Sequence, residues 1–198
     1  THKTDSEYPM CFAKLRDSRT TFWETSEKYK NINQGVFIDV FPIDYYPDNI
    51  GHILFDIRKF LISTRISHTF YSKNDKTSIK FILLKWLSFI LYPRISYAIS
   101  CQDRLYKSIR HSSLVANLCG AWGKREIVPS DYFEQITIVQ FEGYNFPAPL
   151  KYDQYLSRIY GDYMKLPPEE KQIAHHNTEV IDLDSSYCKY KKRFLDRK

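Results

Sequence analysis

The N-terminal part of the chain alternates between polar and apolar residues, as β-strands do. Over residues 12–16, Lys14 and Arg16 alternate with Ala and Leu, and a period of two places the two basic residues on one face of a strand. A polar turn and a second short strand are expected to follow. The segment Gly35–Phe41 is rich in β-branched and aromatic residues, so we expect a buried strand that ends at Pro42.

The middle of the chain carries apolar residues at helical spacing. Residues 50–72 and 76–92 show this period, and a third helix is expected over 94–111. The apolar part of the second segment is shorter than the roughly 20 residues that a membrane span needs, and it contains Lys85. Two interpretations remain open for it: a helix buried in a protein core, or an interfacial helix lying on a membrane with Trp86 at its surface.

The rest of the chain returns to strand patterns and then to a helix. The pattern predicts a strand over 133–143 with a turn at its end, an extended connector over 145–149, and a helix that Asp153 caps and Gly161 closes. The fold class is therefore α+β. We expect one domain over residues 1–198, in four parts: a sheet part 8–48, a helical insertion 49–112, C-terminal strands and a helix 113–176, and a polar tail 177–198.

Composition narrows the functional classes. Hydrophobic residues make up 43% of the 198 residues, enough to build a core, and the 6 glycines form no phosphate-binding loop motif. The net charge of +6 suits an anionic ligand or a membrane surface, and it does not single out nucleic acid. The 4 cysteines have no metal-binding or redox spacing, so we expect reduced thiols in a cytoplasmic protein.

The most informative chemical feature is Asp39, a carboxylate among large apolar residues in the strand 35–41. An ionised carboxylate is costly to bury without a cationic partner. Two interpretations remain: Asp39 binds a divalent metal, or it is held by backbone N–H groups or an arginine at the end of the strand. With Asp44 and the basic face of Lys14 and Arg16, it forms a candidate site for metal-dependent phosphoryl transfer.

Three blocks of the chain resemble the LicD family of phosphocholine transferases. The first is Lys14-Leu-Arg-Asp17, and the second is Gly35-Val-Phe-Ile-Asp-Val-Phe-Pro-Ile-Asp44. The third begins at Phe141-Glu-Gly-Tyr-Asn-Phe-Pro-Ala-Pro149 and continues through Tyr160-Gly-Asp-Tyr-Met164 to His175. Their order and spacing match the family, and together they cover nearly the whole chain.

The resemblance implies a nucleotidyltransferase-like fold, with a mixed sheet flanked by helices. It implies transfer of phosphocholine, or a similar phospho-alcohol, from a CDP-linked donor to a cell-surface glycan such as lipopolysaccharide or teichoic acid, or to a lipid-linked glycan. By this resemblance Asp39 is a catalytic residue and a ligand of Mg²⁺ or Mn²⁺. Lys14 and Arg16 are candidates for diphosphate contacts; the alternative is that they are surface residues or partners in ion pairs. Asp44 and His175 are candidate substrate contacts. The alternatives are that Asp44 caps a loop and that His175 is a solvated histidine in a loop.

One departure from the family limits this interpretation. LicD proteins carry an upstream aspartate-rich motif, which would lie before residue 1. We therefore expect the chain to be a C-terminal portion that is inactive by itself and truncated at its sheet. The competing hypothesis is a non-catalytic module that binds an anionic glycan or nucleotide. We further expect a cytoplasmic location, at the inner face of a membrane if residues 79–97 make a peripheral membrane contact.

Overall fold

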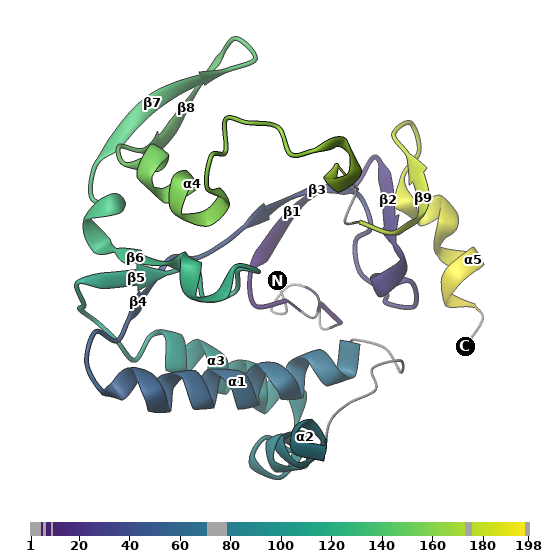
Figure 1. Cartoon of the computed structure of the whole chain (residues 1–198). Helices are drawn as coiled ribbons and strands as arrows, with labels where there is room; N and C mark the ends of the chain where they lie inside the picture. The colour runs from purple at the N-terminus through teal and green to yellow at the C-terminus, as the bar shows by residue number, and fades with distance from the viewer. Residues whose placement is uncertain (1–4, 6, 9, 71–78, 173–175, 197–198) are drawn as a thin grey trace. The chain divides into compact units, whose positions relative to one another are not determined.

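The computed structural model describes the chain except for a few short stretches: residues 1–4, 6, 9, 71–78, 173–175 and 197–198, together with the side chains of residues 67–70 and 79–81. The described chain forms two compact units (Figure 1). The first unit comprises residues 1–41, 60–102 and 173–198, and the second comprises residues 42–59 and 103–172. The expected single domain over 1–198 stays a prediction.

The first unit contains two small antiparallel sheets. Strand β1 (Ala13–Asp17) pairs with β3 (Val36–Val40), and β2 (Thr21–Glu24) pairs with β9 (Thr178–Asp182). The expected strands at 12–16, after the first turn and at 35–41 are thus confirmed. The strand β3 is not buried, because β1 is its partner in a two-stranded ribbon and its apolar side chains Val36, Ile38 and Val40 remain exposed.

Residues 178–195 are folded, where a polar tail was expected over 177–198. Strand β9 pairs with β2, and a short helix, α5 (Lys191–Leu195), follows it. Phe194 on α5 packs against the fully buried Trp23, with ring centroids 4.6 Å apart. Burial of two large aromatic rings explains why a segment of mostly polar residues is ordered there.

Three longer helices follow the sequence pattern closely. They are α1 (Gly51–Phe70), α2 (Ile79–Leu91) and α3 (Ile95–Tyr106). The boundary between the two units passes through α1 and α3. Within the described residues, no single helix is both long and apolar enough to cross a membrane; α2 from Ile82 and α3 reach that composition only as a pair, bent by 90°.

The second unit consists of a three-stranded sheet, a hairpin and a helix. The sheet orders β4 (Asp44–Tyr46), β5 (Leu114–Ala116) and β6 (Ile127–Pro129). The hairpin joins β7 (Ile136–Phe141) to β8 (Tyr144–Pro149), so the expected connector at 145–149 is instead a strand. Helix α4 (Tyr152–Tyr160) ends at Gly161, which has a positive φ of 77°.

The fold class α+β is therefore confirmed. Across the described residues, the strands form four separate antiparallel sheets of two or three strands, and there are five α-helices. One mixed sheet was expected, and the described strands do not form one. The nucleotidyltransferase-like fold and the truncation stay predictions.

Candidate functional site

The candidate site lies on one face of the ribbon formed by β1 and β3. The register places Lys14 opposite Asp39 and Arg16 opposite Phe37. Because side chains alternate between the two faces of a strand, these four residues share one face, as the period of two predicted for the basic pair. The other face carries Leu15 opposite Ile38, and both side chains are exposed.

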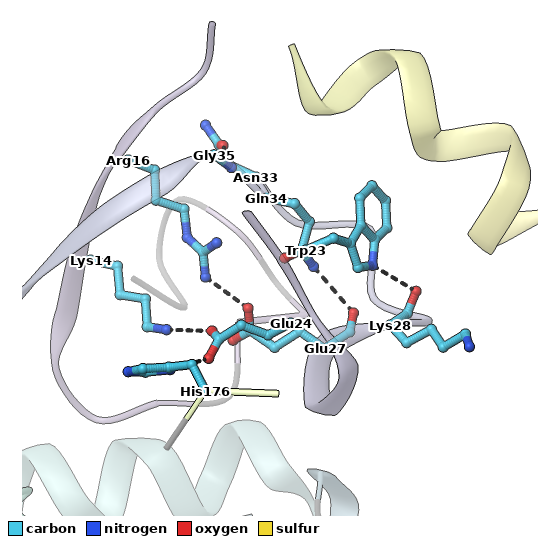
Figure 2. Close-up of polar contacts among 10 residues, drawn as sticks. All are labelled: Lys14, Arg16, Trp23, Glu24, Glu27, Lys28, Asn33, Gln34, Gly35 and His176. Atoms are coloured by element: carbon cyan, nitrogen blue, oxygen red, sulfur yellow. Dashed lines mark hydrogen bonds and ion pairs between the residues drawn. The ribbon is translucent and has the colours of Figure 1, made fainter. Parts of the chain in front are cut away.

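Lys14 does not point into solvent. Its Nζ donates a hydrogen bond to Glu24 Oε2 at 2.8 Å, and the exposed fractions of the two side chains are 4% and 10%. The same carboxylate bonds through Oε1 to His176 Nδ1, also at 2.8 Å. Glu24 thus joins a strand-borne lysine to a histidine 152 positions further along the chain (Figure 2).

Arg16 is held in a second, more deeply buried ion pair. Its Nη2 donates to Glu27 Oε2 at 2.7 Å, and the exposed side-chain fractions are 6% and 1%. Gln34, also fully buried, donates through Nε2 to the Glu27 carbonyl oxygen at 3.1 Å. Figure 2 shows Lys14 and Arg16 side by side, each directed at its own glutamate. Both basic charges are therefore compensated by carboxylates of this chain.

Aromatic rings complete the cluster around His176. The imidazole meets Phe22 and Phe37 edge-on, with centroids 6.1 and 5.9 Å apart. The ammonium group of Lys14 lies 3.5 Å from the centroid of the Phe37 ring, in a cation–π contact. These apolar walls limit the water around the Lys14–Glu24–His176 contacts and so strengthen them.

The electrostatics follow from burial and from these partners. Burial by itself raises the pKa of the Glu24 carboxyl, but the hydrogen bonds from Lys14 and His176 outweigh it and leave the pKa lowered. Burial raises the pKa of the Tyr8 hydroxyl, against the opposing charge of Arg16. Glu24 is therefore an anion at neutral pH, and it accepts hydrogen bonds from both of its neighbours.

The expected metal ligand Asp39 shares the face of this cluster but is exposed rather than buried. The expectation of a carboxylate in a dry strand is wrong because the ribbon leaves β3 uncovered. In the described part of the chain, no group of three or more His, Cys, Asp or Glu side chains could hold a metal ion. One carboxylate supplies too few ligands for Mg²⁺, so the residues described here do not by themselves fit a metal site.

The other predicted contacts fall elsewhere. Asp44 lies on β4 in the second unit, where burial, together with the nearby Asp103, raises the pKa of its carboxyl. His175 lies outside the described residues, whereas its neighbour His176 is part of the cluster. The roles of Asp39, Lys14, Arg16, Asp44 and His175 as ligand contacts stay predictions.

Sequence reasoning missed Glu24, Glu27 and His176. Glu24 and Glu27 lie three residues apart at the end of β2 and in the turn after it. Two carboxylates after a strand, and two basic residues alternating on a nearby strand, were a signal for paired charges. Nothing local pointed to His176, because its contact with Glu24 spans most of the chain.

The cysteines also differ from expectation. Cys101 and Cys188 are not in disulfides, whereas Cys11 and Cys119 are disulfide-bonded. The expectation of reduced thiols is therefore wrong for two of the four, and the cysteines no longer support the expected cytoplasmic location.

Comparison with known proteins identified one relative by sequence. The chain is 28% identical over 184 residues to the lipopolysaccharide cholinephosphotransferase LicD of Haemophilus influenzae. The alignment covers 90% of this chain and 67% of that protein. A scan against protein-family profiles and a search of solved structures found no match.

Proposed function

From the relationship of this chain to the LicD family, which the sequence comparison confirms, we propose that it acts in phosphocholine transfer. The donor is a CDP-linked alcohol, and the acceptor is a hydroxyl of a cell-surface glycan, lipopolysaccharide being the acceptor class that the relative's name gives. The similarity over 184 residues, aligned with 90% of the chain, is the observation that carries the proposal.

The proposed reaction needs a base. An acceptor hydroxyl oxygen forms a bond to the phosphorus that carries the choline ester, the bond from that phosphorus to the CMP oxygen breaks, and CMP leaves with the electron pair. The hydroxyl proton must be removed in the same step. An ionised Glu24 can only accept a hydrogen bond, so Nδ1 of His176 donates to it, and Nε2 is the ring atom that would take up the proton.

We assign the base to His176 for this reason. Its side chain is 54% exposed, so a ligand can reach it, while Glu24 fixes its tautomer and the rings of Phe22 and Phe37 fix its plane. Lys14 neutralises Glu24, and in this proposal it positions the carboxylate rather than the donor. The proposed metal would need oxygen ligands beyond Asp39, and no step is assigned to it.

The test is transfer from CDP-choline to lipopolysaccharide, measured as release of CMP, with the upstream aspartate-rich segment of the family restored before residue 1. Removal of a general base costs 10²–10⁴-fold in rate, so His176→Gln is expected to lower kcat by at least about a hundredfold, with a smaller change in KM. Asp39→Asn is expected to lower the rate of transfer as well, because Asp39 shares the face of the ribbon that carries Lys14. Glu179→Gln, which breaks an ion pair with Lys28 in the same unit, is the control and should retain full activity.

Unchanged transfer in His176→Gln would remove His176 from the proposal, and unchanged transfer in Asp39→Asn would remove Asp39. The non-catalytic alternative is separated by calorimetry with CDP-choline. Binding of equal strength with and without Mg²⁺, in a protein that releases no CMP, would favour a binding module.

A further inference from the structure

Helix α2 presents its most apolar side to solvent and its more polar side to the protein. The side that packs on the rest of the first unit carries Lys85, Ser88 and Phe89, and Tyr92 follows directly after the helix. These positions have the i, i+3, i+4 and i+7 spacing of a single helix face. Ser88 is fully buried there and donates to the Lys85 carbonyl oxygen at 2.7 Å. A helix at the surface of a protein in water has the opposite arrangement.

The exposed side of α2 is apolar over residues 82–91. Every exposed residue in that range is a large hydrophobic one, and Leu83, Trp86 and Ile90 are the most exposed, at 64, 67 and 73%. The full exposed set comprises Ile82, Leu83, Leu84, Trp86, Leu87, Ile90 and Leu91. At 3.6 residues per turn these positions cover an arc of roughly 200°. Such a patch is larger than the scattered exposed apolar residues that are normal on a protein surface.

The orientation of α2 is fixed by buried contacts at its C-terminal end. The buried guanidinium of Arg65 donates to the carbonyl oxygens of Tyr92 and Pro93 at 2.8 and 3.0 Å. Its Cζ also lies 4.3 Å from the centroid of the Phe89 ring. These contacts satisfy carbonyls that the helix end would otherwise leave free. The apolar arc therefore points outward because the opposite side is anchored.

Charge indicates what covers this arc. From residue 76 to residue 102 the sequence has Lys76, Lys80, Lys85 and Arg94 and no Asp or Glu. A cationic segment around an apolar helix with an exposed Trp is typical of helices that lie in the surface of an anionic membrane. A second protein helix covers a stripe of about 100°, about half of this arc, whereas fluid acyl chains can surround all of it.

We propose that α2 docks in the surface of an anionic lipid membrane. Leu83, Trp86 and Ile90 enter the boundary between headgroups and acyl chains, and the positive charge of the segment favours an anionic surface. The helix lies along the surface and does not cross, consistent with the 90° bend between α2 and α3. This inference concerns location and does not depend on the proposed transfer reaction.

The test uses the purified chain and sedimentation with vesicles, in the absence of any donor or acceptor. We expect partition onto vesicles that contain about one quarter phosphatidylglycerol, and weaker partition onto pure phosphatidylcholine or in about 0.5 M NaCl. Leu83→Gln and Ile90→Gln are each expected to lower the partition coefficient about tenfold, because each removes a large apolar side chain from the buried arc. Leu15→Gln, at a position 66% exposed in the same unit, should leave it unchanged.

Fluorescence checks the depth of the helix. Trp23 is fully buried, and Trp122→Phe removes the exposed tryptophan of the second unit, which leaves Trp86 as the exposed probe. Its emission should shift to the blue with anionic vesicles and be quenched by lipids with brominated acyl chains. The proposal would be overturned if the chain did not partition onto anionic vesicles even at low salt, or if it partitioned without quenching of Trp86. It would also be overturned if Leu15→Gln lowered the partition coefficient as much as Leu83→Gln does. A dimer in solution that Leu83→Gln dissociates would also overturn it and assign the arc to a second copy of the chain.

Discussion

The buried pair of Arg16 and Glu27 offers a sharp test of the electrostatic argument. At 2.7 Å and an effective dielectric constant of about 20, the attraction between the two charges is about 6 kcal/mol. Taking both ions out of water offsets most of this gain, so the pair adds little net stability. Loss of one partner is different, because the other charge then stays buried without compensation, at a cost of about 3–5 kcal/mol.

Glu27→Gln removes the charge and keeps the shape. We expect the free energy of unfolding to fall by about 3 kcal/mol or more, since the Arg16 side chain is only 6% exposed. Urea denaturation followed by the fluorescence of buried Trp23 measures this loss. The double variant Arg16→Met with Glu27→Leu should recover most of it, because neither charge is then left alone.

Glu179→Gln is the matched control, because it breaks a more exposed pair with Lys28 in the same unit. It should change the stability very little. A loss of less than about 1 kcal/mol in Glu27→Gln would refute the reasoning. Arg16 would then have another anion or water within reach, and its candidacy as a diphosphate contact would gain support.

Two further predictions concern pH and the hairpin. The pKa of Glu24 is lowered, so its contribution to stability is present above the ordinary carboxyl pKa of 4.5 and is lost as the pH falls through the folded-state pKa. Glu24→Gln should therefore flatten the acid limb of a Tm profile measured between about pH 3 and pH 7. An acid limb that Glu24→Gln leaves unaltered would contradict this. In the hairpin turn, Glu142 and Gly143 have positive φ angles of 50° and 80°, as in a type I′ turn. Glu142→Asn is therefore expected to raise Tm, and Gly143→Ala is expected to lower the free energy of unfolding by about 1–2 kcal/mol in chemical denaturation. Equal effects of the two changes on stability would argue against backbone strain.

The sequence predicted what depends on neighbouring residues. The basic face of β1 and the helices α1 and α2 follow from periods of two and 3.6, which are local properties. The turn before β8 was also predicted, but β8 itself was not: residues 145–149 were expected to be an extended connector, and they contain Pro147 and Pro149, which are unusual in a strand. They are tolerated because a strand with one partner leaves an edge on which no N–H donor is needed.

The failures concern contacts between residues far apart in the sequence. Burial of β3 was inferred from its composition, yet burial depends on which strands and helices cover a sheet, and no local pattern gives that. The fold of residues 178–195 depends on the pairing of β9 with β2 and on the packing of Phe194 against Trp23. Of the two alternatives for α2, the helix buried in a core is wrong for residues 82–91, whose apolar side is exposed, and the interfacial helix stays a prediction.

The same geometry bears on whether Lys14 contacts a donor. Its Nζ is already bonded to Glu24 and lies against the Phe37 ring, so a diphosphate could reach it only by displacing the carboxylate that holds His176. We therefore expect Lys14→Met to raise the pKa of Glu24, shift the acid limb of the stability profile upward and leave the affinity for CDP-choline nearly unchanged in calorimetry. Lys14→Arg keeps the charge and is the control for folding. A tenfold loss of affinity with an unshifted acid limb would place Lys14 on the ligand and overturn its role as a partner of Glu24.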